Sequence, residues 1–255
     1  MTDSSSVVSS IYRSGKVYDL LYPGGAGGPD FWSELAQTYG DPVLELMSGT
    51  GFIAIPLAQK GHDVTGVEMA EPMLVEAERK SEAAGVDIMW VRSDVRALDL
   101  GRQFKLIYLP SNSICHLLTR QDLEACLATV ARHLHPEGRF ALNVFVPSLP
   151  MLTRSPEEEQ EFGSYLDPDS GEQVVMTNRS WYDPATQMKY NQLSRRVGKG
   201  PLEPDGELTM RIYFPQELDA LLWYNGFAIE HKYGEDRRPY DAQSGVQYYV
   251  LKLRD

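Results

Sequence analysis

The sequence predicts an α/β fold: a seven-stranded, mostly parallel sheet with an antiparallel C-terminal edge and an antiparallel β insertion after the fifth strand. Three observations lead to this prediction. Residues 42–58 read as strand, tight turn and helix, and short apolar strands alternate with helical segments from there to residue 146. Between residues 147 and 210 the pattern changes to polar and apolar alternation with turn residues, which is typical of antiparallel strands.

The stretch from Pro42 to Ala58 organises the rest of the chain. Residues 43–46 are mostly apolar, as a buried parallel strand requires, and Ser48-Gly49-Thr50-Gly51 then interrupts the run. Apolar residues resume at helical spacing from Ile53. The glycines allow a sharp turn and a close approach of a ligand to the backbone. This order is the opening of a Rossmann-like nucleotide-binding unit.

A second signal is an acidic strand end: Glu68 closes the predicted strand 62–68 and lies 17 residues after Gly51. A carboxylate at this place can accept hydrogen bonds from ribose hydroxyls. On this signal alone, a nicotinamide dinucleotide and an adenosyl cofactor fit equally well.

Glu45 distinguishes between these two candidate ligands. It lies within the first strand, four positions before Gly49, where a carboxylate would repel the pyrophosphate of a dinucleotide. S-adenosylmethionine (SAM) carries an ammonium and a sulfonium, which suit an acidic strand end. The pattern Glu-x-x-x-Gly-x-Gly, followed by the acidic end of strand two, resembles the class I SAM-dependent methyltransferases.

The resemblance implies SAM as cofactor and S-adenosylhomocysteine (SAH) as product. It also implies a contact between an acidic residue after strand three and the adenine amino group, and Asp94 occupies that position; a turn or N-cap aspartate is the competing interpretation. The predicted cofactor-binding residues are Tyr18, Tyr22, Glu45, Met47, Gly49, Gly51, Glu68, Met69, Asp94, Val95 and Leu109.

The N-terminal region, residues 1–40, is predicted to form a tail and lid helices. Tyr18-Asp-Leu-Leu-Tyr22 resembles the lid segment of small-molecule N-methyltransferases, in which an aromatic residue closes over SAM. A packed amphipathic helix explains the two tyrosines equally well. The glycines of residues 24–28 predict a hinge, and Asp30 is placed to cap a helix over 31–39.

The remaining chain divides into a SAM-binding core (41–146), a substrate-side insertion (147–210) and a C-terminal part of the core (211–255). Within the insertion the pattern predicts a hairpin of strands 174–182 and 188–197 and a further strand at 208–214, while 156–161 is predicted to be an acidic, solvated run. The other predicted elements are helices 72–80, 123–134 and 215–226 and strands 88–94, 104–109, 139–145, 227–233 and 246–253.

The loop after strand four indicates the class of acceptor. Nucleic-acid amino-methyltransferases carry Asp/Asn-Pro-Pro-aromatic here, whereas this chain has Leu109-Pro110-Ser111-Asn112. The segment 112–117 instead resembles the corresponding loop of small-molecule methyltransferases. The predicted catalytic residues are His116, as an acceptor-side base, and Tyr18; a helix-start histidine is the alternative for His116. The predicted substrate-binding residues are Asn112, His116, Trp181, Tyr182, Arg211 and Tyr213.

The composition limits the partners. A net charge of −12 and a pI of about 4.9, without a basic cluster, disfavour nucleic acid and anionic membranes. Only Cys115 and Cys126 are present, in no metal-like spacing, so no metal is expected and a reducing cytoplasm is the expected location. Residues 1–10 lack the features of a signal peptide. The oligomeric state is predicted as monomer or homodimer.

The predicted function is transfer of a methyl group from SAM to a small-molecule acceptor by direct displacement with weak base assistance. Nitrogen is the favoured acceptor atom. An O- or C-methyltransferase of secondary metabolism is the nearest alternative. More distant alternatives are an NAD(P)-dependent oxidoreductase, which leaves Glu45 unexplained, and a non-catalytic SAM-binding regulator.

Overall fold

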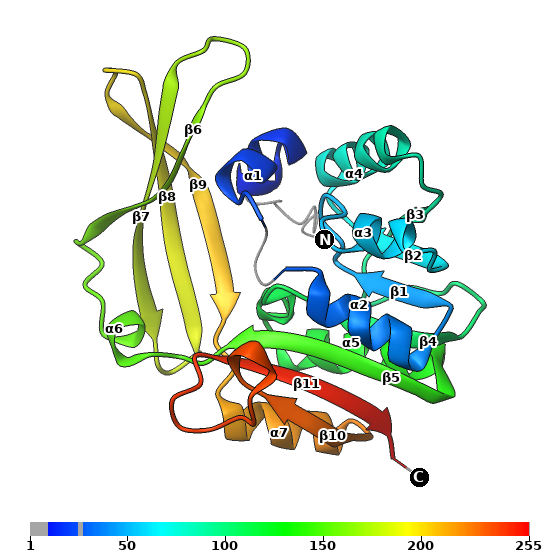
Figure 1. Ribbon diagram of the computed structural model, residues 1–255. Helices are drawn as coiled ribbons and strands as arrows, with labels where there is room; N and C mark the ends of the chain where they lie inside the picture. Colours follow the sequence, from blue (N-terminus) through cyan, green and yellow to red (C-terminus); the bar gives the residue numbers. More distant parts are fainter. Residues whose placement is uncertain (1–9, 25–27, 255) are drawn as a thin grey trace, which may run out of the picture.

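A computed structural model describes residues 10–24 and 28–254 and shows two sheets standing side by side (Figure 1). The larger sheet has the strand order β10-β11-β5-β4-β1-β2-β3, and the smaller one, sheet B, has the order β6-β7-β8-β9. The predicted fold class is confirmed. The predicted N-terminal tail and the centre of the glycine hinge lie outside the described residues.

The large sheet is parallel except at its C-terminal edge. Strand β11 runs antiparallel to both β5 and β10, while β1 pairs in parallel with β2 and β4. Its strands are β1 (Val43–Leu46), β2 (Val64–Glu68), β3 (Met89–Arg92), β4 (Phe104–Leu109), β5 (Leu134–Phe145), β10 (Phe227–Tyr233) and β11 (Val246–Leu253). The carboxyl ends of the five parallel strands therefore share one edge, and sheet B stands beside it (Figure 1).

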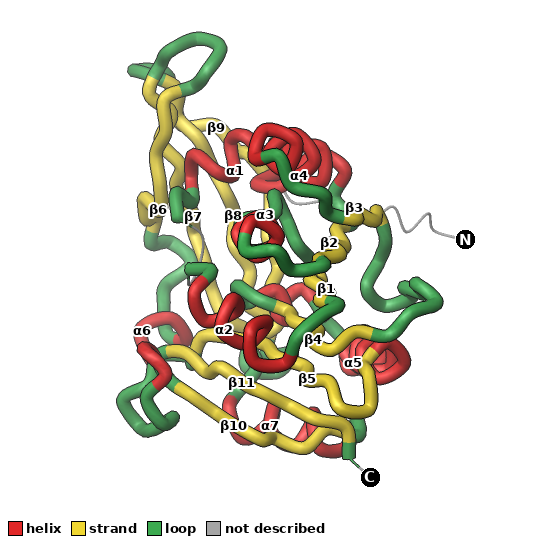
Figure 2. The backbone as a smooth tube through the Cα atoms, turned by 45° about the vertical axis from the view of Figure 1, so that its right-hand side comes forward, coloured by secondary structure: helices red, strands yellow, loops and turns green. Residues whose placement is uncertain are grey.

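Helices cover both faces of the large sheet. Helices α2 (Asp30–Tyr39) and α3 (Ala54–Gln59) lie on one face (Figure 2). They pack there around the buried Trp32 and Leu57. Helices α5 (Arg120–His133) and α7 (Pro215–Tyr224) pack on the other, where Cys126 is a core residue. The remaining helices are α1 (Gly15–Leu21), α4 (Glu71–Ala84), α6 (Leu149–Leu152) and the 3-10 turns η1 (Ser10–Tyr12), η2 (Ser113–His116) and η3 (Glu235–Arg237).

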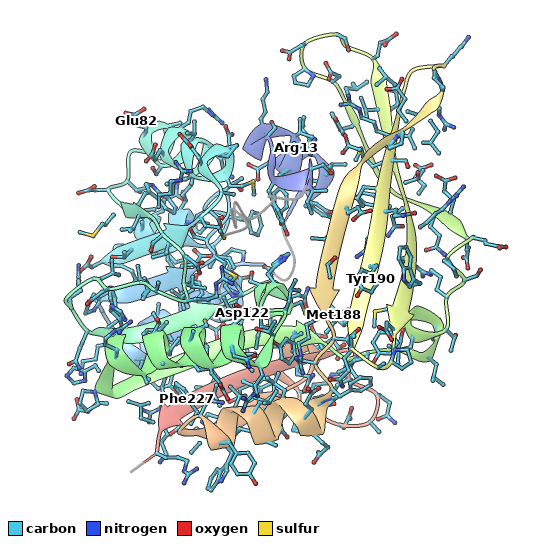
Figure 3. All side chains as sticks on the ribbon, turned by 180° about the vertical axis from the view of Figure 1, so that it is seen from behind. Arg13, Glu82, Asp122, Met188, Tyr190 and Phe227 are labelled. Atoms are coloured by element: carbon cyan, nitrogen blue, oxygen red, sulfur yellow. The ribbon has the colours of Figure 1, made fainter. Side chains whose placement is uncertain are left out.

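Sheet B contains β6 (Glu159–Leu166), β7 (Gln173–Asp183), β8 (Met188–Val197) and β9 (Leu202–Arg211). The predicted hairpin is confirmed as β7 and β8. The inner face of sheet B, which faces the core, carries Val174 and Met176, and these pack against Leu21 of α1. Figure 3 shows the sheet from behind, with Met188 and Tyr190 labelled on β8.

Four predictions of local structure were wrong or incomplete. Residues 159–161 are exposed or partly exposed, as predicted, but they also begin the unpredicted strand β6, because they pair with β7. The last strand of the insertion ends at Arg211, since its pairing with β8 stops there. Asp30 is the first helical residue of α2 and does not cap it. Strand β5 begins at Leu134 and not at the predicted residue 139, as Leu134 already pairs with Phe104.

Helix α1 bridges the two sheets. Its first residue, Gly15, lies so close to α4 that a Cβ there would approach the carbonyl oxygen of Pro72 to 2.9 Å. On the other side Leu21 contacts Gly163 of β6 and the apolar inner face of sheet B. The N-terminal segment thus lies over the carboxyl edge of the large sheet, where the predicted lid belongs.

We expect Gly66→Ala to destabilise the fold. A Cβ at Gly66 would overlap the ring of Trp90, which pairs with it across β2 and β3 and donates a hydrogen bond to Ser81 at 3.1 Å. Displacing a packed ring typically costs about 1–3 kcal/mol. Thermal and urea unfolding would measure the loss.

The control is the same substitution in a Trp90→Leu background, where the added methyl group has room. A smaller loss in that background supports the steric explanation. An equal loss in both backgrounds would contradict it.

Candidate active site

The centre of the candidate site is the turn after β1. Met47, Gly49 and Gly51 have φ angles of 54°, 55° and 76°, so the chain makes its bend in the left-handed region. The N–H of Ser48 donates to Val67 O at 2.9 Å, which holds the turn against β2. A side chain at Gly51 would meet the ring of Trp90 at 2.8 Å. The predicted glycine turn is therefore present, although Met47 adopts a glycine-like φ while its side chain packs on the core.

Glu68 ties the tip of β2 to this turn. Its carboxylate accepts hydrogen bonds from the backbone N–H groups of Gly49, Met69 and Ala70, at 3.0, 2.9 and 2.8 Å. Burial raises the pKa of Glu68, and the three N–H donors oppose that shift. A carboxylate has about four acceptor positions, so one remains for a further donor.

Glu45 is the second carboxylate of the site and is 2 % exposed. The Tyr108 hydroxyl donates to its Oε2 at 3.1 Å, across the paired strands β1 and β4. Burial raises the pKa of Glu45 to about 8, against the lowering effect of Tyr108 and a backbone N–H at Ala54. Tyr108 in turn stacks on Trp32, with ring centroids 5.1 Å apart.

Neither Glu45 nor Glu68 forms an ion pair with any lysine, arginine or histidine that the structure describes. Buried carboxylates without a cation are costly, and the charge of Glu68 adds to burial in raising the pKa of Glu45. The turn therefore offers acceptors and negative charge to a cationic ligand, and it would repel an anionic one.

The other predicted cofactor residues lie at the same edge with different environments. Met69 is 39 % exposed beside Glu68, whereas Leu109 and Val95 are buried in the core. Asp94 accepts from Arg96 Nη2 at 2.6 Å and also from the backbone N–H of Arg96, so its carboxylate forms a turn contact and an ion pair. Arg96 lowers the pKa of Asp94. Its predicted contact with adenine stays a prediction.

An aromatic series runs from the N-terminal segment to the loop after β4. Tyr18 and Tyr22 lie with ring centroids 4.9 Å apart, and Tyr12 lies 5.8 Å from Tyr18. The Tyr12 hydroxyl is 2.9 Å from Nε2 of His116, whose pKa is lowered by burial. The structure thus brings Tyr18, Tyr22 and His116 together, as predicted residues of one site. It adds Tyr12, which the sequence analysis did not assign.

A polar contact holds α1 against the glycine turn; we call Asp19, Thr50 and Lys80 the lid latch. The Thr50 hydroxyl donates to Asp19 Oδ1 at 2.5 Å, and Lys80 of α4 pairs with Asp19 Oδ2 at 2.6 Å. Thr50 lies between Gly49 and Gly51. Helix α1, which carries the predicted lid residues, and the predicted cofactor turn are therefore joined directly.

The loop after β4 is held by side-chain amides. Ser111 and Asn112 have φ angles of 58° and 62°, and Asn112 Oδ1 accepts from the N–H of Phe145 at 2.8 Å. Asn143 Oδ1 accepts from the N–H of Ser111 at 2.7 Å. Asn112 therefore positions the loop that carries His116, and its predicted contact with substrate remains a prediction.

The predicted acceptor residues of the insertion fall into different places. Tyr182 lies on the inner face of sheet B, while Trp181 stacks on Tyr190 on the outer face, with centroids 5.4 Å apart. Arg211 pairs with Glu217 at 2.7 Å. The buried Tyr213 donates to Leu117 O at 2.6 Å. The structure brings Tyr182 to the core side but does not bring Trp181 there.

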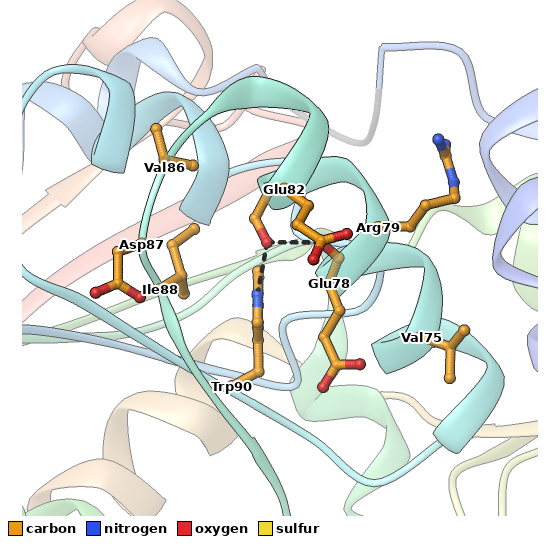
Figure 4. A pocket seen from close by; sticks show the side chains of 9 residues that line it. Val75, Glu78, Arg79, Glu82, Val86, Asp87, Ile88 and Trp90 are labelled. Atoms are coloured by element: carbon orange, nitrogen blue, oxygen red, sulfur yellow. Dashed lines mark hydrogen bonds between the residues drawn. The ribbon is translucent and has the colours of Figure 1, made fainter.

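A surface hollow of about 500 Å³ lies elsewhere, on the outer side of α4 and β3 (Figure 4). Glu78, Glu82 and Asp87 line it, and its Trp90 donates to Ser81. The ring of Trp90 lies between this hollow and Gly51. The hollow is therefore separate from the glycine turn and contributes none of the predicted site residues.

Within the described ranges, no group of three or more histidine, cysteine, aspartate or glutamate side chains is arranged to hold a metal ion. The same part of the chain contains no helix that is both long and apolar enough to cross a membrane.

Comparisons with known proteins agree with this geometry. Residues 43–138 match the family model of a methyltransferase domain. The chain is 32% identical over 114 residues to a putative methyltransferase, YqeM, of Bacillus subtilis, covering 44% of this chain and 46% of that protein. It is 29% identical over 131 residues to a dTDP-3-amino-3,4,6-trideoxy-α-D-glucopyranose N,N-dimethyltransferase of Streptomyces venezuelae, covering 48% and 53%. The chain thus aligns with about half the length of these curated relatives.

Solved structures extend the likeness to nearly the whole chain. The CcbJ methyltransferase of Streptomyces caelestis has a TM-score of 0.81 and 25% identity, with 96% of this chain and 98% of that one covered. A more distant neighbour, the amino pentose methyltransferase CalS10 of Micromonospora echinaspora, was solved with SAM bound; its TM-score is 0.63 at 18% identity, with 87% and 88% covered. These findings agree with the resemblance read from Glu45, the glycine turn and Glu68: residues 43–138 match a methyltransferase domain, and the fold is that of SAM-dependent methyltransferases.

Proposed function

We propose that this protein transfers a methyl group from SAM to the nitrogen of a small-molecule acceptor. The observation that carries the proposal is the pair of buried carboxylates, Glu45 and Glu68, at the glycine turn. Within the described chain neither has a cationic partner, and a cationic adenosyl ligand supplies one.

The residues at the turn fit that ligand. Glu68 keeps one acceptor position beyond its three N–H contacts, which suits a ribose hydroxyl. Gly49 lets the ligand approach the backbone, since a Cβ there would find only Met73 Cε, at 3.7 Å. Glu45 would supply negative charge beneath the turn once a bound cation favours its ionised form. The exposed Met69 offers apolar surface next to Glu68.

The bound cofactor would supply a methyl group already activated on a sulfonium. The chain's own residues would align the acceptor, exclude water and keep the attacking nitrogen unprotonated. His116 suits the last role, because burial lowers its pKa and leaves the imidazole neutral at pH 7. Tyr12, Tyr18 and Tyr22 would close the site from the side of the lid.

The choice of nitrogen rests on the relatives. The Streptomyces venezuelae relative is named as an N,N-dimethyltransferase of an amino sugar, and CalS10 as an amino pentose methyltransferase. The neutral histidine is consistent with an amine acceptor.

Incubation with methyl-labelled SAM and a panel of small amines, including amino sugars and amino acids, tests the proposal. Formation of SAH together with a labelled amine supports it. A labelled hydroxyl or carbon product would support O- or C-transfer instead. SAM binding without any SAH would favour a regulator, and binding of a nicotinamide dinucleotide in place of SAM would favour an oxidoreductase.

Glu68→Ala should weaken SAH binding by about tenfold or more, because a charged acceptor is lost. It should also lower the free energy of unfolding by about 1–3 kcal/mol, since three N–H groups lose their acceptor. Titration calorimetry and urea unfolding measure the two effects. Glu68→Gln, which keeps one oxygen, should recover part of the stability. Unchanged SAH affinity in both variants would remove Glu68 from the site.

Glu45 should give the protein a pH dependence in the absence of cofactor. Its pKa is raised from 4.5 to about 8, so the folded state disfavours the ionised form. Its contribution to stability is therefore complete below about pH 4.5 and is lost as the pH rises through about 8. Glu45→Gln should lose less stability over that range in thermal melts.

The ionisation of Glu45 should also be coupled to ligand binding. A bound ammonium favours the ionised carboxylate, so SAH binding should release a proton below about pH 8, and its affinity should rise towards that pH. Calorimetry in buffers of different ionisation enthalpy counts the proton. Glu68, whose pKa is also raised, is compared through Glu68→Gln. Identical proton release in wild type and Glu45→Gln would contradict the assignment.

His116→Ala should lower kcat by about a hundredfold with SAH affinity unchanged. In wild type, the acid side of the kcat profile should fall at a pH below 6.5, because burial lowers the pKa of His116 and protonation removes the base. Tyr12→Phe keeps the imidazole and should cause a smaller loss. The amine that gives turnover in the panel serves as substrate. A near-normal kcat for His116→Ala would assign His116 to structure alone.

A further inference from the structure

A second charged group lies on the inner face of sheet B. It consists of Arg154, Asn178, Ser180, Lys189 and Asn191, and we call it the inner-face cluster. Asn178 and Ser180 continue the alternation of Val174 and Met176 along β7, and Ser180 pairs directly with Asn191 of β8. Lys189 is two residues from Asn191 and therefore shares that face.

Hydrogen bonds fix the cluster. Lys189 Nζ donates to Asn191 Oδ1 at 2.6 Å, and Asn191 Nδ2 donates to Leu208 O at 2.8 Å. Asn178 Nδ2 also donates to Asn191 Oδ1, at 3.4 Å, and Arg154 Nη1 reaches Ser180 Oγ at 3.5 Å. Asn191 and Ser180 are 4 % and 1 % exposed. The lysine is thus held on a buried polar support rather than extended into solvent.

The two cations of the cluster lack counter-ions. Across the residues that the structure describes, neither Lys189 nor Arg154 forms an ion pair, although the chain carries 36 acidic and 24 basic residues. Burial, and next the charge of Arg154, lower the pKa of Lys189 to about 8. Two neighbouring cations without a carboxylate destabilise the fold unless an anion joins them.

The cluster faces the acceptor side of the proposed site. Strand β9, which neighbours β8, packs against η2. The Cys115 thiol of η2 interacts electrostatically with Lys189, and His116 follows Cys115 in the chain. An acceptor whose nitrogen lies at His116 would therefore extend its remaining groups towards Lys189.

We propose that the inner-face cluster binds an anionic group of the methyl acceptor, a carboxylate or a phosphate, through Lys189 and Arg154. This inference rests on the proposed function, because it assigns the cluster to the acceptor of that reaction. The amide of Asn191 and the hydroxyl of Ser180 orient the two cations. The substrate class is then a small amine that also carries a negative charge.

The test uses the full chain saturated with SAH and two probes, inorganic phosphate and acetate, titrated separately by calorimetry at pH 7. Wild type should bind at least one probe. Lys189→Met and Arg154→Met should each weaken that binding by about tenfold or more, because a charge-assisted contact is lost. Arg196→Met is the matched control, since Arg196 lies exposed on the outer face of the same strand and should leave binding unchanged.

The outcomes are distinguishable. Tighter binding of phosphate points to a phosphorylated amine, and tighter binding of acetate points to an amino acid. Absence of binding by both probes, or equal weakening by Arg196→Met, would overturn the inference. If Lys189→Met fails to fold in circular dichroism, Arg154→Met alone decides. SAH binding is measured first. If SAH does not bind, that result counts against the proposed function, and the anion titration is then run on the protein without SAH.

Discussion

The site depends on two carboxylates that folding removes from water at the same edge of the sheet. The parallel pairing of β1 and β2 places Leu46 beside Val67, so Glu45 and Glu68 lie close to the turn that separates β1 from α3. Tyr108 and backbone N–H groups offset part of the cost of burying them. A bound cation would offset more of it. Burying both carboxylates at one turn therefore leaves an electrostatic cost that binding of a cationic cofactor would reduce.

The lid latch connects this turn to the rest of the molecule. Asp19 binds Thr50 within the turn and Lys80 on α4, while Leu21, two residues later, packs on the inner face of sheet B. Any outward movement of α1 must therefore break contacts with both the glycine turn and the inner face of sheet B. One short helix thus contacts both the glycine turn and sheet B. It packs so closely on α4 that Gly15, its first residue, has no room for a side chain.

The sequence predicted the parallel core well because strand period and turn chemistry are local signals. β8, β10 and β11 occur at the predicted residues, and the glycine turn lies where expected. Contacts between distant residues were harder to predict. Tyr108 reads as one more apolar residue of a buried strand, and only the register of β1 against β4 shows that it meets Glu45. Tyr12 and His116 are 104 positions apart, and no local pattern joins them. The strand that begins at residues 159–161 was not predicted, because acidic side chains on an exposed edge strand resemble a solvated loop.

In the proposed reaction, the two carboxylates of the glycine turn and the two cations of the inner-face cluster would act on the same nitrogen. An amine attacks only when it is unprotonated, and nearby positive charge lowers the pKa of an ammonium. Two cations at the inner-face cluster exceed the single charge of a carboxylate, so one positive charge remains near the acceptor after an anionic group has bound. Across the site, Glu45 and Glu68 compensate the positive charge of the cofactor. The acceptor nitrogen would therefore experience a net field that favours its neutral form, and His116 would need to remove only a proton that is already weakly held.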